Sequence, residues 1–368
     1  MTEGPSPGLG VRRGAFHQLQ VLAVEPVAED AVAVSFSVPD HLKPAFSFQA
    51  GQHVTLRTWL DGSEVRRTYS ICAPTGSALL QIGVRRLPGG VMSQFIHDLL
   101  RPGDALDVAE PAGHFTLPLD PYHGGSYVAV AAGSGITPVL SLIGSALATE
   151  VTSKAVLLYG NRTVESTMFL EEISDLKDRY PDRFQLVPLF SRERQEVELY
   201  NGRLSGPKVE SLVTQFVDIA RVDAWLLCGP HPMVTAVREV LTGRGVPESL
   251  IHTELFFVED EPPVRSEEEQ RAVDRGGGVT VRARLDGRET EFTMTSAQTI
   301  VDALAAVRPD APYSCKGGVC ATCRARLLEG KVLMDHTYAL EADDQEAGYI
   351  LTCQAHPVSE LVTVDYDG

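Results

Sequence analysis

The chain has little positive charge and few cysteines. Its 368 residues include 32 Lys and Arg against 49 Asp and Glu, which gives a formal net charge of −17. Nucleic-acid binding requires a positively charged footprint, so this balance argues against DNA or RNA as a partner. Six cysteines are also too few for a small secreted scaffold that is held together by disulfides.

Long apolar runs are scarce as well. Residues 124–149 form one stretch without a charged side chain, long enough in principle to cross a bilayer. Gly133, Gly135 and Pro138 interrupt it, so a buried strand, a tight turn and a helix explain it better. Residues 1–14 hold several glycines and prolines and no apolar segment, which predicts a flexible tail and no signal peptide. We therefore expect a cytoplasmic protein with no membrane partner.

The order of β-type and helical patterns predicts a multidomain chain. Residues 15–120 contain short β-type runs between turn residues and predict an antiparallel barrel or sandwich with one helix. Residues 121–258 alternate apolar strands with helices, which is typical of a doubly wound α/β domain. The Pro- and Gly-containing residues 259–277 predict a linker, and residues 278–368 predict a third compact unit.

Four cysteines in the third unit form the most specific motif of the chain, with the spacing Cys315-x4-Cys320-x2-Cys323-x29-Cys353. This order is that of plant-type [2Fe–2S] ligands. The glycines between the first two cysteines allow backbone N–H groups to approach the sulfurs and donate to them. A structural zinc site is the alternative, although zinc frameworks usually contain two Cys-x2-Cys pairs and this chain has one.

A glycine-containing turn predicts a nucleotide site in the α/β unit. Gly133 and Gly135 follow a predicted buried strand, and Thr137 begins the next helix. Glycines there allow close approach to a pyrophosphate, whose charge the helix N-terminus favours. Because Pro138 takes the place of the last glycine in Gly-x-Gly-x-x-Gly, an ordinary strand–helix turn stays open as the alternative.

Two arginines bear on the choice of nicotinamide nucleotide. Arg162 follows the second strand of the α/β unit, where NAD-preferring sites often place an acid, and Arg192 follows the next strand. Cations near the ribose 2′ position favour NADPH over NADH. Solvated surface arginines are the alternative.

The first unit contains residues suited to a flavin. Arg67, Tyr69 and Ser70 lie together at a strand end, where they can pair with phosphate, stack on a flat ring and donate a hydrogen bond. Gly90 and Ser93 begin the helix of this unit, and its N-terminus is a second place for an anion. Each of these features alone is common in ordinary strands and helices.

Together, and in this order along the chain, these motifs resemble the ferredoxin–NADP reductase superfamily. Pro111-x-Gly113-x-Phe115 and Cys228-Gly229-Pro230 add to the resemblance. With a plant-type ferredoxin at the C-terminal end, the chain is similar to reductases that feed multicomponent oxygenases. The resemblance implies FAD on a β-barrel, a nicotinamide nucleotide on an α/β domain and an α+β (β-grasp) ferredoxin domain.

The resemblance also implies roles for single residues. Cys228 would lie beside the nicotinamide ring, and Glu254 belongs to a segment that closes over the flavin, so these two are the catalytic candidates. With the two arginines above, the expected cofactor contacts are Arg67, Tyr69, Ser70, Gly90, Ser93, Gly133, Gly135, Thr137, Arg162, Arg192, Gly229 and Phe256.

The implied function is electron transfer from NADPH, or NADH, through FAD and a [2Fe–2S] cluster to an oxygenase. The phenylacetyl-CoA ring 1,2-epoxidase of phenylacetate degradation is the first expectation for that partner, and steroid or aromatic-ring hydroxylases are alternatives. Lys316, Arg324 and Arg326 are candidate contacts to it. Two further classes stay open, a stand-alone flavin and iron–sulfur redox sensor and a zinc-stabilised binding module.

Overall fold

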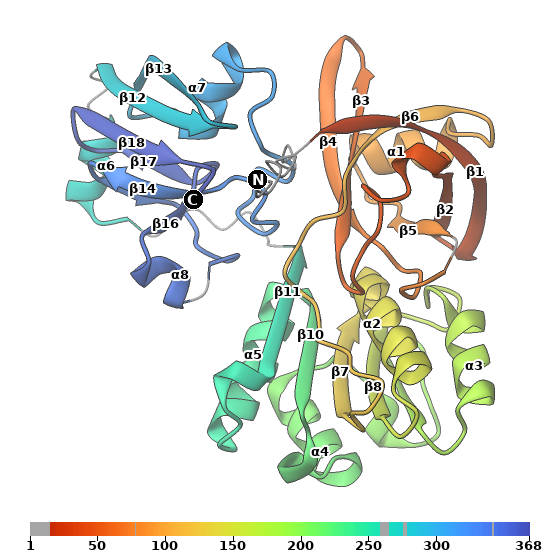
Figure 1. Ribbon diagram of the computed structural model, residues 1–368. Helices are drawn as coiled ribbons and strands as arrows, with labels where there is room; N and C mark the ends of the chain where they lie inside the picture. Colours follow the sequence, from red (N-terminus) through yellow and green to blue (C-terminus); the bar gives the residue numbers. More distant parts are fainter. Residues whose placement is uncertain (1–14, 78, 258–264, 275–277, 341) are drawn as a thin grey trace, which may run out of the picture.

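The computed structural model describes residues 15–77, 79–257, 265–274, 278–340 and 342–368, which form three units (Figure 1). The predicted tail (1–14) and residues 259–264 and 275–277 of the predicted linker lie outside these residues. The described part of that linker contains helix α6 (Glu267–Asp274), where Ser266 and Glu269 form a capping pair through Oγ and Oε2 at 2.8 Å. No helix in the described ranges is long and apolar enough to cross a membrane.

The first unit is an antiparallel sheet with the strand order β4-β3-β6-β1-β2-β5. Its elements are β1 (Phe16–Ala28), β2 (Ala31–Ser37), β3 (His53–Leu60), β4 (Ser63–Ser70), β5 (Leu80–Arg85), α1 (Val91–Asp98) and β6 (Ala105–Ala109). Ile71, just past β4, bridges to Ile82 in β5, so the two edge strands meet and the sheet closes. Met92 and Ile96 of α1 are buried against this core, which confirms the predicted barrel with one helix.

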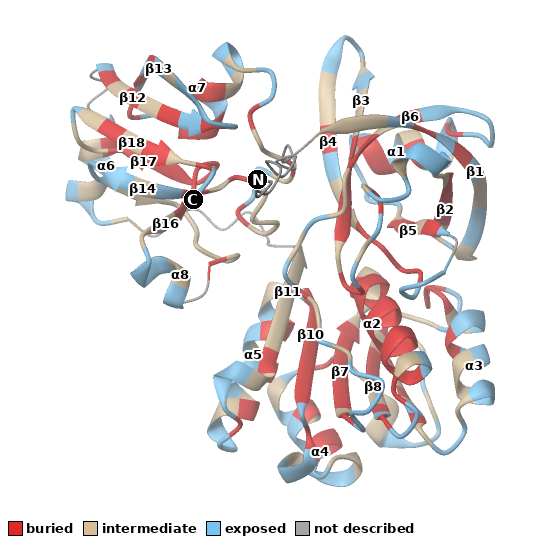
Figure 2. Ribbon diagram, viewed as in Figure 1, coloured by how far each residue is buried: buried red, intermediate tan, exposed pale blue. Residues whose placement is uncertain are grey.

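The second unit is a parallel sheet with the strand order β11-β10-β7-β8-β9. Its elements are β7 (Ser126–Ala132), α2 (Ile136–Thr149), β8 (Lys154–Asn161), α3 (Leu170–Arg179), β9 (Phe184–Phe190), α4 (Gly206–Phe216), β10 (Ala224–Pro230), α5 (His231–Gly243) and β11 (Ile251–Phe257). Successive residues of β7 face opposite layers: Ala129 packs with α2 and α3, and Val130 packs with α4 and α5. The predicted doubly wound domain is therefore confirmed, and its central strands β7 and β10 and helix α2 are largely buried (Figure 2).

The strand order of this sheet reverses between β7 and β10, and ligands of open α/β sheets bind outside such a point. The single 3-10 turn η2 (Gly133–Gly135) joins β7 to α2 there, with Gly133 in the left-handed region at φ 55°. A Cβ on Gly135 would lie 2.2 Å from the carbonyl oxygen of Cys228 at the end of β10. The glycine is thus required for the turn to pack against the neighbouring strand.

The third unit is a mixed sheet with the strand order β13-β12-β18-β14-β16 beside the pair β15-β17. Its elements are β12 (Gly278–Leu285), β13 (Arg288–Thr295), α7 (Ile300–Val307), β14 (Arg324–Glu329), β15 (Val332–Met334), α8 (Ala342–Glu346), β16 (Tyr349–Leu351), β17 (Ala355–Pro357) and β18 (Leu361–Asp365). The outer ladders are antiparallel and β12 pairs with β18 in parallel. Helix α7 begins after Thr299, whose Oγ1 accepts a hydrogen bond from the N–H of Asp302.

Short 3-10 turns complete the described secondary structure. They are η1 (Asp40–Leu42), η3 (Glu198–Tyr200), η4 (Ile219–Arg221) and η5 (Glu248–Leu250).

The contact of Gly135 gives a first prediction. Gly135→Ala forces a methyl group into backbone atoms of β10, and we expect a loss on the order of 3 kcal/mol in unfolding free energy. Gly243→Ala is the control, because a Cβ at this helical position meets nothing within 4 Å. Denaturant unfolding of both variants measures the difference, and equal stabilities contradict the assignment.

Candidate functional site

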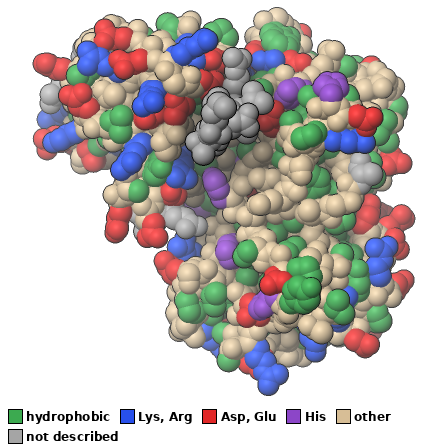
Figure 3. Space-filling model, viewed as in Figure 1, with side chains coloured by type: hydrophobic (Ala, Val, Ile, Leu, Met, Phe, Trp, Pro, Cys, Tyr) green, Lys and Arg blue, Asp and Glu red, His purple; other side chains and the backbone are tan. Residues whose placement is uncertain are grey.

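A cavity of about 650 Å³ lies where the three units meet. Histidine side chains line this junction on the face shown in Figure 3. The barrel contributes His53, Arg67, Thr68, Tyr69, Ser70, Gly83, Arg85, Leu87, Gly90, Met92 and Ser93, and the α/β unit contributes Ser134, Glu254, Leu255 and Phe256. The third unit contributes Cys315, Lys316, Gly317, Val319, Cys320, Asp335, His336, Tyr338 and Gln354.

The cavity brings together part of the predicted site. The predicted residues that line it are Arg67, Tyr69, Ser70, Gly90, Ser93, Glu254, Phe256, Cys315 and Cys320. The predicted residues outside its lining are Gly133, Gly135, Thr137, Arg162, Arg192, Cys228, Gly229, Cys323 and Cys353.

Hydrogen bonds join the barrel to the α/β unit at one wall of the cavity. Ser70 Oγ at the end of β4 donates to Glu254 Oε2 of β11 at 3.1 Å. His53 Nδ1 lies 3.8 Å from the other oxygen of the same carboxylate. Burial raises the pKa of Tyr69, so its hydroxyl keeps its proton and is available as a donor. The wall therefore holds two hydroxyls and a carboxylate in fixed positions.

The turn before α1 is also held by local hydrogen bonds. Ser93 Oγ donates to the carbonyl of Gly90 at 3.0 Å and accepts from the N–H of Leu87 at 3.1 Å. Arg67 Nη1 donates to the carbonyl of Arg66 at 2.7 Å, and the rest of its guanidinium is exposed at the cavity. These contacts place one cation and one helix N-terminus on the same wall.

Two of the predicted nucleotide contacts, Cys228 and Thr137, are buried. Cys228 has no exposed surface, and burial, with a smaller effect from Glu254, raises the pKa of its thiol. Thr137 is 1% exposed, and its Oγ1 donates to the carbonyl of Ser134 at 3.0 Å. Ser134 is the residue of the glycine turn that lines the cavity, and the sequence analysis did not single it out.

Arg85 is a cavity residue that the sequence analysis missed. Its Nη1 lies 3.3 Å from where a Cβ of Gly133 would stand, and its Nε lies 3.4 Å from Asp30 Oδ1. The other oxygen of Asp30 pairs with Arg162, so one carboxylate is shared by two guanidinium groups. A basic residue at the end of β5, two positions after Gly83, was the available sequence signal.

Arg162 and Arg192 lie next to each other, as the sequence predicts for the ends of adjacent strands. The backbone N–H of Arg192 donates to the carbonyl of Arg162 at 2.9 Å, and Arg192 is exposed. The charge of Arg162 is partly neutralised by Asp30.

The four cysteines gather at one end of the third unit. Cys315 exchanges side-chain hydrogen bonds with Cys320 and Cys353, and Cys323 does so with Cys353. These bonds lower the pKa of Cys315 and of Cys323, and they raise the pKa of Cys320 and of Cys353. Among the described residues, no three His, Cys, Asp or Glu side chains converge on a single metal position.

Backbone and amide donors point at these sulfurs. The N–H of Gly317 lies 3.4 Å from Cys315 Sγ. Gln354 Nε2 lies 3.6 Å from Cys353 Sγ and donates to the carbonyl of Lys316 at 2.9 Å. Donors around thiolates are what an iron–sulfur cluster requires of its surroundings, so the residues present fit the group.

The three basic residues near the cysteine loop differ in their partners. Lys316 pairs with Asp302 at 2.7 Å, and Arg324 pairs with Asp344 at 3.2 Å. Arg326 is exposed. Their contact with an oxygenase stays a prediction.

Family models match successive parts of the chain. An oxidoreductase FAD-binding domain matches residues 18–117, and an oxidoreductase NAD-binding domain matches residues 129–239. A 2Fe–2S iron–sulfur cluster binding domain matches residues 283–358, which include all four clustered cysteines. The chain therefore has domains for FAD, for a nicotinamide nucleotide and for a [2Fe–2S] cluster.

Curated relatives match nearly the whole chain. A component of the 1,2-phenylacetyl-CoA epoxidase of Escherichia coli (strain K12) is 41% identical over 353 residues, 96% of this chain and 98% of the relative. The chain belongs to the ferredoxin–NADP reductase superfamily. Within this superfamily, the ferredoxin reductase component of a Rhodococcus rhodochrous 3-ketosteroid-9-alpha-monooxygenase is 35% identical, with 95% of this chain and 96% of the relative covered.

A solved member of the superfamily has the same three-unit fold. Phthalate dioxygenase reductase superposes with a TM-score of 0.57 at 24% identity, with 95% of this chain and 98% of that chain covered. The predicted order of a flavin barrel, an α/β domain and a ferredoxin-type domain is thus confirmed.

The amide of Gln354 gives a second prediction. Gln354→Ala removes the donor to Cys353 Sγ and to the Lys316 carbonyl, so we expect iron loss to a chelator to become about tenfold faster. Gln298→Ala is the matched control, since Gln298 is an exposed amide of the same unit that caps Thr295. Iron release followed by absorbance tests this, and identical rates in both variants refute it.

Proposed function

We propose that this chain transfers electrons from NADPH through FAD and a [2Fe–2S] cluster to the oxygenase component of a multicomponent monooxygenase. The observation behind the proposal is the shared cavity, because Tyr69, Ser70, Glu254, Cys315 and Cys320 all line it. A flavin on the barrel would therefore contact both its electron donor and the cluster loop. A location in the cytoplasm is part of the proposal.

In this scheme, the residues of the chain bind and orient the cofactors. When bound, the flavin supplies the exchange between a two-electron donor and a one-electron acceptor. Tyr69, Ser70 and Arg67 are proposed to hold it on the barrel, with Gly90 and Ser93 at its pyrophosphate and Phe256 against the ring. Cys315, Cys320, Cys323 and Cys353 are the proposed ligands of the irons.

The remaining predicted residues are assigned to the nicotinamide nucleotide. Gly133, Gly135 and Gly229 are proposed to let the backbone pack closely at the switch point and approach the nucleotide there, while Cys228 and Thr137 support the turn from the core. Glu254 is proposed to orient Ser70 at the reacting rings, since its carboxylate accepts the Ser70 hydroxyl.

Phenylacetyl-CoA is the proposed substrate of the partner oxygenase. The Escherichia coli relative named for this epoxidase is more similar over the whole chain than the steroid monooxygenase reductases, at 41% against 35% identity. Reductases of other ring or steroid hydroxylases are the second candidate, since they share the domain order.

An anaerobic visible spectrum before and after NADPH tests the electron path. We expect flavin bands and broad iron–sulfur absorption, both bleached by NADPH. Bleaching of the flavin without reduction of the cluster contradicts the relay. Addition of oxygenase components that act on phenylacetyl-CoA or on a steroid then distinguishes the two partner classes.

We also propose that Arg162 and Arg192 favour NADPH by pairing with its 2′-phosphate. Removing the cation in Arg162→Ala is expected to lower the NADPH-to-NADH ratio of kcat/KM about tenfold, because hydrogen bonds to charged groups contribute roughly 1.5–3 kcal/mol. Asp30→Asn is expected to raise the ratio, since it releases Arg162 from its carboxylate. Arg221→Ala is the control at the opposite end of the sheet, and equal ratios in all variants contradict the proposal.

A further inference from the structure

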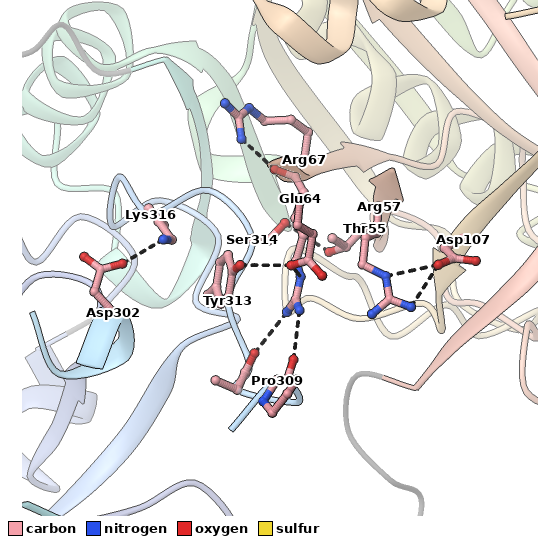
Figure 4. Close-up of polar contacts among 12 residues, drawn as sticks. Thr55, Arg57, Glu64, Arg67, Asp107, Asp302, Pro309, Tyr313, Ser314 and Lys316 are labelled. Carbon is pink, nitrogen blue, oxygen red and sulfur yellow. Dashed lines mark hydrogen bonds and ion pairs between the residues drawn. The ribbon is translucent and has the colours of Figure 1, made fainter. Parts of the chain in front are cut away.

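The barrel and the third unit meet along one face of the β3–β4 hairpin (Figure 4). Arg57 pairs with Arg66 across the two strands, and Thr55 pairs with Thr68, so these side chains share a face. Leu56 on the alternate face is buried in the barrel core. The polar face is therefore turned outward, toward the segment that precedes Cys315.

Arg66 is the centre of this contact. Its Nη1 donates to the carbonyl of Ala311 and its Nη2 to the carbonyl of Pro309, both at 3.0 Å. Its Nε donates to Glu64 Oε1 at 2.7 Å. Although cationic, the residue is only 5% exposed, and its guanidinium lies 4.3 Å from the ring centre of Tyr313. Each nitrogen of the guanidinium thus donates a hydrogen bond, and two of the three acceptors belong to the third unit.

Neighbouring groups strengthen the same contact. Tyr313 Oη donates to Glu64 Oε1 at 3.0 Å, so one carboxylate receives a bond from each unit. Thr55 Oγ1 donates to Ser314 Oγ at 3.1 Å, and the hydroxyl of Thr68 also bonds to Ser314. Ser314 is buried and directly precedes the first cysteine of the loop. The hairpin therefore fixes the backbone one residue away from Cys315.

The end of the same hairpin also lines the proposed flavin site. Thr68 and Ser70 line the cavity together with Cys315 and Cys320. A single hairpin thus contacts both the cysteine loop and the residues proposed to hold the flavin, which sets the separation between the two sites.

We infer that Arg66 is a positioning residue that docks the cysteine loop against the flavin unit and so controls electron transfer between them. This inference rests on the proposed function. Two electrons leave the nicotinamide nucleotide together, and each reduction of the cluster removes one of them from the flavin. Arg66 touches neither the flavin site nor the cysteines, and it acts by holding residues 309–314. A loosely docked third unit would slow electron transfer from the flavin to the cluster and would leave reduction of the flavin unchanged.

Arg66→Lys tests the inference because it keeps the charge but loses the planar fork that reaches both carbonyls. We expect reduction of the flavin by NADPH at the wild-type rate and reduction of the cluster slowed about tenfold, both followed by anaerobic stopped flow. This factor corresponds to about 1.4 kcal/mol of docking free energy. Hydrogen–deuterium exchange of residues 309–314 is expected to accelerate by a similar factor, a readout that does not depend on electron transfer.

Arg57→Lys is the matched control. Arg57 lies opposite Arg66 in the hairpin and stacks on the same Phe16 ring, but its guanidinium pairs with Asp107 inside the barrel unit. We expect wild-type cluster reduction and wild-type exchange in this variant. Tyr313→Phe and Glu64→Gln weaken the contact without removing the arginine, so they provide the test if Arg66→Lys does not fold.

The outcomes separate the inference from the function on which it rests. A wild-type cluster that NADPH never reduces refutes the proposed function. The role of Arg66 is overturned if the wild-type protein relays electrons and the three variants Arg66→Lys, Glu64→Gln and Tyr313→Phe match it. The match must hold both in the rate of cluster reduction and in hydrogen–deuterium exchange. Equal slowing in Arg57→Lys also overturns it, because the effect would then belong to the barrel.

Discussion

The arrangement of the molecule depends on a buried positive charge at the junction of two folded units. Burying a guanidinium is costly unless it is paired and hydrogen-bonded, and each nitrogen of Arg66 donates a hydrogen bond, one to a carboxylate and two to backbone carbonyls. Because the carbonyls belong to the third unit, separating that unit would leave the cation and Glu64 with fewer partners. The apolar core of the third unit is separate, whereas one apolar cluster spans the barrel and the α/β unit. Polar contacts of this kind therefore decide how the third unit meets the barrel.

A second junction joins the barrel to the α/β unit and depends on shape. Gly83 of β5 lies where any side chain would collide with Thr137 and with the ring of Phe169, and Gly135 is pressed against the end of β10. Glycines at these places allow the barrel to approach the switch point of the sheet. The proposed flavin and nicotinamide sites are neighbours because the backbones come this close.

The sequence predicted features that depend on local spacing and failed where partners come from distant segments. Cysteine spacing, the glycine turn and the order of strands and helices correctly indicated the cluster loop, the switch point and the three units. The partner of Arg162 is Asp30, 132 positions earlier, and no local pattern links them. Likewise, the alternation of side chains along a strand places Arg66 and Arg67 on opposite faces of β4. It does not indicate which of the two faces contacts the third unit, more than 240 residues away in the sequence. Close packing of the turn buries Cys228 and Thr137, and the spacing of their motifs does not reveal this burial.

Backbone acceptors at the Arg66 contact have a consequence for how such chains evolve. The guanidinium recognises the path of residues 309–311 and not their side chains, so substitutions there leave the contact intact as long as the bend is kept. A ferredoxin-type module with a different surface, suited to a different oxygenase, could be joined to the same flavin and nicotinamide units without a new interface. Partner choice can then diverge by recombination of modules while the internal electron path is inherited unchanged.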